Sequence, residues 1–198
     1  MEIYEAMSTM RSVRLFTDEP VTEEQLNQVL RMAQFAPNGS NEQRYRFIVV
    51  RDPEQRAKIG HIYRDGITKA MGVNSIEEAE SLADKAGIMR REVVALAKNL
   101  ATVPPVIIFA GGTGNWQSEP AASVFPAVQN LCLAAWAMGL GTIITTAWQR
   151  DEDAVRKVLG VPKDVYLGAL IPLGHPARKY GPPKRGPVDE IIVRDRWS

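Results

Sequence analysis

Hydrophobic residues recur at helical spacing in the first forty positions and indicate two helices. The first is expected to run from Ile3 to about Arg11. The second is expected to begin after Thr22, a good N-cap, because Gln25 three residues later completes a capping box. Pro37 disfavours helical backbone in the residue before it, so the second helix is expected to stop short of that proline.

Short apolar runs further along the chain indicate strands. The run Val106–Ala110 is continuously apolar, which is typical of a strand buried on both faces. The complete set of expected strands is Phe47–Val50, Val106–Ala110, Thr142–Thr146, Val165–Leu173 and a last one at Glu190–Val193. Helical segments lie between these strands, so the pattern is that of an α/β or α+β layered fold.

The region between the first two strands is expected to be helical. Asp52 is its expected N-cap and Pro53 its first helical residue. Gly66 and Gly72 are expected to interrupt it. The charged segment Glu77–Lys98 is only weakly amphipathic, so we expect it to form a surface or lid element and not a core helix.

The segment Ala121–Met138 is apolar on nearly every side. A helix of this kind is buried by protein all round, so we expect a central core helix or a subunit interface. Pro126 must lie in its first turn or kink it. Asp151 is then expected to cap a shorter helix that ends at Gly160.

Composition places the chain among ordinary globular proteins. Its 198 residues fit a single domain, 1–198, and 45% are apolar and 24% charged. A net charge of +1 gives no global attraction to nucleic acid or to an anionic membrane. With one cysteine, no recognisable signal peptide and no apolar run long enough to span a bilayer, we expect a soluble, cytoplasmic protein.

The usual catalytic groups are scarce. Two histidines, His61 and His175, and the single Cys132 leave no zinc pattern, and there is no G-x-S-x-G elbow. The loop GGTGNW after the Val106–Ala110 strand does not match G-x-G-x-x-G, and a tight turn explains it better. A protein without a recognisable catalytic acid, base, nucleophile or metal site either does no chemistry or takes it from a cofactor.

Two basic clusters and one polar run are candidates for binding. Extended chain would place Ser12 and Arg14 on one face, where they converge on an anion while Arg11 approaches from a neighbouring angle. Lys184-Arg185 lies in the proline-rich GPPKRGP. Each cluster can equally be solvated surface charge. The polar run Pro37–Gln43 can be a docking surface or a plain loop.

Taken together and in order, five blocks of sequence resemble the nitroreductase-like FMN-dependent flavoprotein family. They are R-S-x-R, A-P-N-G-S-N-x-Q-x-Y-R-F-x-V-V, Q-N-L-x-L-A-A-x-x-x-G-L-G-T, G-A-L-I-P-L-G-H-P and P-K-R-x-P. The resemblance spans most of the chain and weakens between about residues 60 and 101, a variable lid region. It implies an α+β fold with a mostly antiparallel central sheet flanked by helices, built as an intertwined homodimer.

The resemblance also implies a function. FMN would take a hydride from NADH or NADPH and pass electrons by a ping-pong mechanism to a small acceptor such as a nitroaromatic or a quinone. No protein residue is a certain catalyst, because the flavin carries the chemistry and Arg14 acts electrostatically. The alternatives are a flavin-binding module for storage or regulation, and an interaction domain whose pocket has decayed. The physiological acceptor, the nicotinamide preference and a deazaflavin donor are left open.

Residues carry over from the family one by one. Arg11, Ser12 and Arg14 would hold the phosphate, the ribityl chain and the pyrimidine edge of FMN, with more charge from Arg185 and Lys184. The amides Asn41 and Gln43 would hydrogen-bond the ring or the ribityl hydroxyls. The remaining expected contacts are Pro37, Asn38 and Gly39 against the partner's flavin, and the backbone of Gly141 and Thr142 near N5.

The chain departs from the family pattern in three places. Many members have a second basic residue where Met10 stands, and Pro-Trp where Arg44-Tyr45 stands. An acidic residue often precedes the apolar helix, where this chain has Ala121-Ala122-Ser123. These departures bear on detailed contacts and on the substrate more than on the cofactor.

Overall fold

Local capping signals fix where the helices of the N-terminal half begin. In the computed structural model, α1 spans Ile3–Thr9 and α2 spans Glu23–Gln34, with the predicted capping box between Thr22 and Gln25 formed in both directions. α3 starts at Pro53 because the Asp52 carboxylate accepts from the backbone N–H of Gln55. The structure describes residues 1–103, 106–111 and 120–197, and only the backbone of 106–110.

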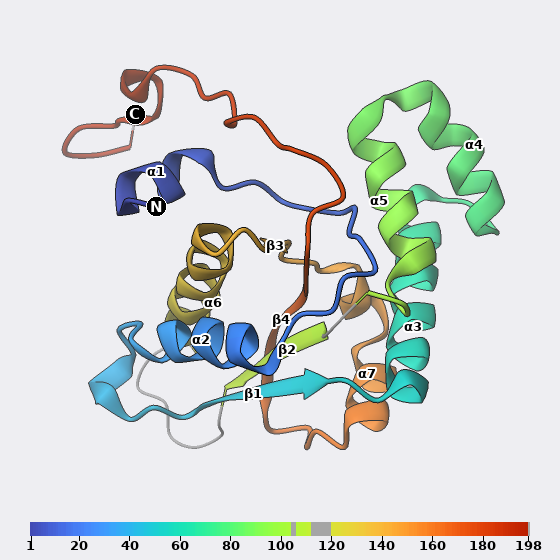
Figure 1. Ribbon diagram of the computed structural model, residues 1–198, viewed down its shortest axis with the longest axis horizontal. Helices are drawn as coiled ribbons and strands as arrows, with labels where there is room; N and C mark the ends of the chain where they lie inside the picture. The colour runs from blue at the N-terminus through green and yellow to red at the C-terminus, as the bar shows by residue number, and fades with distance from the viewer. Residues whose placement is uncertain (104–105, 112–119, 198) are drawn as a thin grey trace.

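Four strands form one antiparallel sheet in the order β1-β2-β4-β3, which confirms the mostly antiparallel prediction (Figure 1). Two strands lie close to their predicted positions, and β1 begins two residues before Phe47. β3 is much shorter than predicted, because only Thr145 of the residues after it bridges back to the sheet, at Leu170. The strands are β1 Tyr45–Val50, β2 Val106–Gly111, β3 Gly141–Thr142 and β4 Tyr166–Gly174.

A bulge at Gly168 shifts the alternation of side chains along β4 by one residue. Phe109 of β2 lies opposite Ala169, and the next residue, Ala110, lies opposite Leu167, so Gly168 is the extra residue on β4. Ala169, Ile171 and Leu173 therefore face one core, while Leu167 and Leu170 both face the other.

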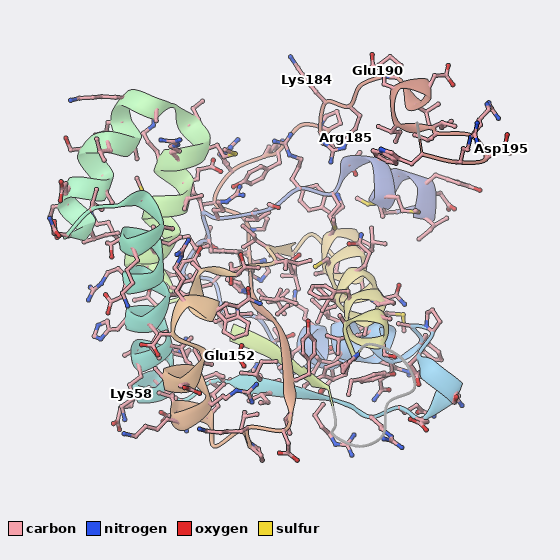
Figure 2. All side chains as sticks on the ribbon, turned by 180° about the vertical axis from the view of Figure 1, so that it is seen from behind. Lys58, Glu152, Lys184, Arg185, Glu190 and Asp195 are labelled. Atoms are coloured by element: carbon pink, nitrogen blue, oxygen red, sulfur yellow. The ribbon has the colours of Figure 1, made fainter. Side chains whose placement is uncertain are left out.

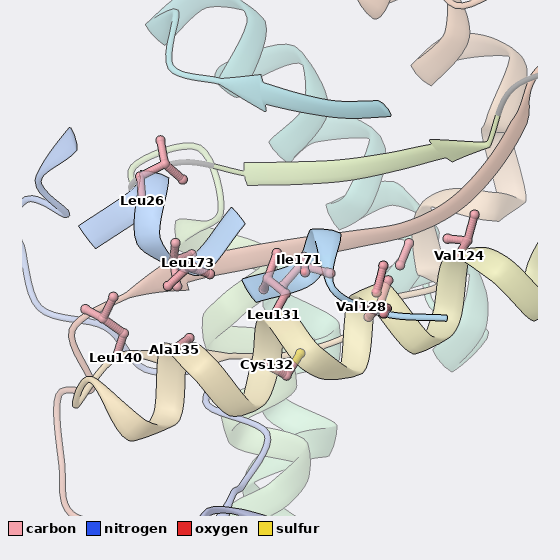
Figure 3. Close-up of a cluster of buried hydrophobic side chains, with 14 of the residues drawn as sticks. Leu26, Val124, Val128, Leu131, Cys132, Ala135, Leu140, Ile171 and Leu173 are labelled. Atoms are coloured by element: carbon pink, nitrogen blue, oxygen red, sulfur yellow. The ribbon is translucent and has the colours of Figure 1, made fainter. Parts of the chain in front are cut away.

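The first core lies between the sheet and the pair α2 and α6. α6, Pro120–Ala137, directs Val124, Val128 and Leu131 at β4 and α2 (Figure 3). Its opposite face is open in the single chain, where Phe125 is exposed, so the expectation of burial on every side is wrong for one protomer. Pro126 is the seventh residue of α6, so it does not lie in the first turn, which was one of its two predicted positions. Within this core, burial raises the pKa of the Cys132 thiol to about 11.

The second core lies on the other face of the sheet. The predicted lid segment 77–98 is two helices, α4 Ile76–Ala86 and α5 Ile88–Asn99, separated at Gly87, whose φ is positive. α5 is not a surface element, because Leu96 and Ala97 are buried against α3 and the sheet. The core is completed by Trp148 of the 3-10 turn η2, Ala147–Asp151, and by α7, Glu152–Leu159, capped by Asp151 and ended at Gly160 as predicted.

Gly66 does not interrupt α3, which runs without a break from Pro53 to Met71. A Cβ on Gly66 would lie 2.1 Å from the carbonyl oxygen of Ala147 in η2. The glycine is therefore required by close packing between two backbones, a reason invisible to local sequence reading. Gly72, the other expected break, does end α3, in the left-handed conformation.

The C-terminal strand expected at Glu190–Val193 is absent from the described structure. Val188–Ile191 form a 3-10 turn, η3, and the chain from 188 onward is exposed, with Trp197 89% accessible. A strand needs a partner edge, and the single chain offers none there. The loop residues 112–116 of GGTGNW lie outside the described residues. Within the described ranges, no helix combines the length and apolar character needed to cross a membrane.

We expect Gly66→Ala to destabilise the protein. Alanine gains about 1 kcal/mol of helix propensity, but a clash with a backbone carbonyl costs more, so a net loss of about 1–3 kcal/mol follows. The midpoint of urea unfolding measures it. Gly181→Ala is the control, because a Cβ there meets nothing within 4 Å. An unchanged or raised midpoint for Gly66→Ala would show that α3 and η2 separate freely.

Candidate functional site

The basic segment at residues 11–14 is held in extended form beside β3. Ser12 forms a parallel bridge with Thr142, and the Val13 N–H donates to the Thr142 carbonyl at 2.9 Å. Val13 is completely buried. Since side chains alternate along extended chain, burial of Val13 turns Ser12 and Arg14 to the opposite side.

Gly141 permits this close approach. A Cβ on Gly141 would lie 2.6 Å from Cβ of Val13 and 2.7 Å from both of its methyl groups. Within one chain the glycine therefore makes room for Val13. Thr142, its neighbour, is buried, and its side chain hydrogen-bonds the Cys132 thiol.

The C-terminal tail, residues 175–187, runs past the same segment. Backbone hydrogen bonds of 2.9 Å join Thr17 to His175 and Leu15 to Ala177. Arg11 then donates through Nη1 to the carbonyls of Gly181, at 3.0 Å, and Pro182, at 3.3 Å. Figure 2 shows Lys184 and Arg185 on the stretch that follows.

The tail, the 11–14 segment and the start of α5 enclose a cavity of about 620 Å³, here called the cationic cavity. One carboxylate, Glu92, lines it and is paired with Arg178. Among the described residues, the other four cations of the lining form no ion pair, so the cavity carries uncompensated positive charge. Its full lining is Met10, Arg11, Ser12, Arg14, Ile88, Met89, Glu92, Arg178, Tyr180, Pro183, Lys184 and Arg185.

A second cavity, of about 490 Å³, lies between α3, α5 and residues 143–150, here called the apolar-walled cavity. Ile67, Val93 and Ile143 contribute apolar wall. Arg14 lines both cavities, and its Nε is buried without a hydrogen-bond partner among the described residues. Burial raises the pKa of Tyr63 to about 12, although Arg14 acts in the opposite direction, so the hydroxyl keeps its proton at neutral pH.

The polar run lies elsewhere. Figure 1 shows residues 37–43 beyond the end of α2, at the opposite side of the molecule from α4 and α5. Two of the hydrogen bonds that fix the loop involve side chains as acceptors: the Gly39 N–H donates to Oγ of Ser123 at 3.0 Å, and the Gln43 N–H donates to Oδ1 of Asn38 at 2.9 Å. Ser40, Asn41 and Gln43 all have positive φ.

One chain therefore assembles part of the predicted site. It brings together Arg11, Ser12, Arg14, Gly141, Thr142, Lys184 and Arg185. It does not bring Pro37, Asn38, Gly39, Asn41 or Gln43 to them.

Two departures from the family pattern have structural explanations. The hydroxyl of Tyr45 donates to the Gln34 carbonyl at 2.8 Å, and its ring stacks on Phe47 at a centroid distance of 5.6 Å. Burial raises the pKa of Tyr45. Met10 lines the cationic cavity and also packs against the first core. Both residues thus contribute to packing.

Sequence reasoning missed Glu92 and Arg178, which lie 86 positions apart and meet at the cavity wall. It also did not assign Tyr63, which lines the apolar-walled cavity, to the site. Neither Glu92 nor Arg178 belongs to a motif, so no local signal was available. Among the described residues, no group of three or more His, Cys, Asp or Glu side chains is placed to hold a metal ion.

Comparison with known proteins agrees over most of the chain. Residues 8–175 match the sequence model of the Nitroreductase family. Iodotyrosine deiodinase 1 from Rattus norvegicus is 30% identical over 97% of this chain and 69% of its own length. The FMN reductase (NAD(P)H) of Bacillus subtilis is 28% identical over 99% of this chain and 74% of its own.

A solved structure gives the same picture in three dimensions. An oxidized iodotyrosine deiodinase bound to FMN and 3-iodo-L-tyrosine superposes with a TM-score of 0.76 at 26% identity, covering all of both chains. With a family match over 8–175 and an α+β architecture shared along the whole length, the chain belongs to the nitroreductase family.

Proposed function

We propose that this protein is an FMN-dependent oxidoreductase that uses NAD(P)H to reduce a small electron acceptor, such as a nitroaromatic or a quinone, by a ping-pong mechanism. The observation that carries the proposal is the place of Arg14. Arg14 lines both the cationic cavity and the apolar-walled cavity. Two such neighbouring cavities suit a ligand with a phosphate at one end and an aromatic ring at the other. A relative named as an FMN reductase (NAD(P)H) supports the choice of FMN and of the donor.

The cationic cavity fits the phosphate. Lys184 and Arg185 stand on exposed tail with no carboxylate paired to them among the described residues, and Ser12 offers a hydroxyl donor nearby. Arg11 contributes charge, although its Nη1 is already used on the tail carbonyls. Charge-assisted hydrogen bonds from such groups to phosphate are the strong kind.

The apolar-walled cavity fits the ring. Ile67, Val93 and Ile143 provide apolar contact, while Gln149 and Arg150 add polar groups to the same lining. The guanidinium of Arg14 lines this cavity and would offer donors to the pyrimidine edge, and its positive charge would stabilise the negative charge that reduction places on the ring. When bound, FMN supplies the hydride-accepting chemistry, so the protein itself needs no acid, base or metal. The chain's own residues bind the cofactor, orient it and exclude water around it.

The site is completed by a second copy of the chain. The polar run 37–43 is too far from Arg14 to contribute within one chain, yet its amides suit a heteroatom-rich ring. An apolar groove of about 420 Å³ between α1, α2 and α6 is open in the monomer, with Ile3 and Phe35 exposed at it. We infer a homodimer in which this apolar face is covered and residues 37–43 reach the partner's cavity.

The acceptor is the least determined part of the function. Relatives include a deiodinase and a flavin reductase, so family membership does not select one substrate. A flavin-binding module without turnover would keep the same phosphate and ring contacts. Only the oxidoreductase would pass electrons from NAD(P)H to the bound flavin, so a test of flavin reduction distinguishes the two functions.

Anaerobic mixing tests the proposed function. The protein is saturated with FMN, freed of excess cofactor by gel filtration, and mixed with NADH or NADPH. We expect about one FMN per chain, loss of the yellow flavin absorbance on mixing, and its return when a quinone or nitroaromatic is added. Retained FMN that neither nucleotide bleaches would show a binding module, and failure to retain FMN would remove the cofactor itself.

Arg14→Ala is expected to weaken FMN binding about 10- to 100-fold, since one or two charged hydrogen bonds are lost. It should also slow flavin reduction, because the ring loses its neighbouring cation. Quenching of flavin fluorescence and stopped-flow absorbance measure the two effects. Arg31→Ala, on the exposed face of α2, is the charge-matched control. Wild-type affinity and reduction rate in Arg14→Ala would contradict the role assigned to this residue.

Mixed dimers test whether two chains share each site. One chain carries Arg14→Ala and the other carries Asn41→Gly with Gln43→Gly, which removes both amides while glycine tolerates their positive φ. If each site takes Arg14 from one chain and the amides from its partner, a mixed dimer has one intact site and one doubly damaged site. We expect one FMN bound per mixed dimer with wild-type affinity.

Each parent homodimer is the control and should lack a wild-type site. Light scattering should give about twice the 21.9 kDa mass of one chain. A mixed dimer with two equally weakened sites would show that both groups act within one chain.

A further inference from the structure

An ion pair between a buried carboxylate and a half-exposed arginine ties α5 to the tail at the edge of the cationic cavity. Glu92 lies on α5 and is 6% exposed. Both Nε, at 2.9 Å, and Nη2 of Arg178 donate to its Oε1. The guanidinium carbon of Arg178 also lies 4.1 Å from the centre of the Tyr180 ring. Arg178 is therefore held from two sides.

Little else holds this part of the tail. Among the described residues from 178 to 197, the hydrogen bonds and ion pairs that reach another element come from two arginines. One is the pair between Arg178 and Glu92, and the other is the donation from Arg11 to the carbonyls at Gly181 and Pro182. Lys184 and Arg185 follow directly, so these two attachments determine where the phosphate-binding cations stand.

We propose that Glu92 and Arg178 are positioning residues that fasten α5 to the tail and thereby set the phosphate end of the cofactor cavity. This rests on the proposed function only in naming the ligand as FMN. The pair links the two walls that face each other across the cavity, since Ile88 and Met89 of α5 and Pro183 of the tail all line it. Separation of those walls would leave Lys184 and Arg185 positioned by the hydrogen bonds from Arg11 alone, among the attachments of the described tail.

The pair has a second, electrostatic task. Glu92 is the carboxylate in the lining of a cavity that takes an anion. Paired with Arg178 its charge is compensated, whereas alone it would repel the phosphate. Loss of Arg178 by itself should therefore harm binding more than loss of both partners, because much of the cost of breaking a buried pair comes from the charge left behind.

Trypsin digestion of the apoprotein tests the fastening without any cofactor. Glu92→Leu removes the acceptor of the Arg178 hydrogen bonds and places an apolar side chain at this buried position. We expect trypsin cleavage after Lys179 to become about 10-fold faster, because the tail opens more often. Glu92→Gln retains a carbonyl acceptor for Arg178 and should restore most of the protection. Glu80→Leu is the control, because Glu80 of α4 pairs with Lys98 of α5, the helix that carries Glu92, and forms no ion pair with the described tail.

Equal cleavage rates for wild type, Glu92→Leu and Glu80→Leu would overturn the fastening. The fastening would also be overturned if Glu92→Leu and Glu80→Leu both had a lower melting temperature and neither was cleaved faster after Lys179. Thermal unfolding is measured on each variant so that global destabilisation is separated from local opening of the tail.

FMN binding tests the electrostatic task. By fluorescence quenching we expect the dissociation constant of Arg178→Met to be about 30-fold above the wild-type value. In the double variant Arg178→Met with Glu92→Gln, we expect it to be only about 5-fold above the wild-type value. Equal dissociation constants for Arg178→Met and the double variant would overturn this role of the Glu92 charge. If wild-type protein takes up no FMN, the proposed function fails, while faster cleavage in Glu92→Leu would still support the fastening.

Discussion

The contact between Val13 and Gly141 is the constraint on which the site depends. A buried valine leaves space for no side chain on the facing strand, so the segment at residues 11–14 can lie against β3 only where a glycine stands. That one contact orients Ser12 and Arg14 outward. It also places the chain after Arg14 where it pairs with residues 175–177. The N-terminal cations and the C-terminal cations, about 170 positions apart, meet as a result.

The predictable parts of this fold are those determined by neighbouring residues. The capping box at Thr22, the cap at Asp52 and the glycine at the end of α7 each follow from chemistry within a few positions, and each was predicted correctly. Gly66 was misjudged because its reason is a carbonyl in η2, about eighty residues away. Glu92 and Arg178 were missed for the same reason. A strand at Glu190–Val193 was wrong because strand propensity alone supplies no partner edge.

Part of the candidate site was predictable as well, through resemblance to a family and not through geometry. The clusters at Arg11–Arg14 and Lys184-Arg185 line one cavity, and their role in holding FMN is a proposal. The run 37–43 does not join them in one chain. Its three non-glycine residues at positive φ carry strain, which persists only where surroundings over-determine it, here through Asn38 and Ser123. Strain kept in a surface loop is itself an indication that the loop shape has a use.

The extra residue at Gly168 has a consequence for how the two cores tolerate change. Residues on one side of a bulge keep their facing whatever happens on the other side. A deletion of Gly168 would restore regular pairing, with Leu167 still opposite Ala110 and Ala169 still opposite Phe109, so both residues would keep the faces they now occupy. The cofactor cavities attach to the half of β4 that follows the bulge, because Thr145 of one lining bridges to Leu170, and Ser12 of the other bridges to Thr142 of β3, the strand beside β4. Loss of the extra residue at the bulge would therefore leave both cores and the strand pairing beside the proposed flavin site as they are.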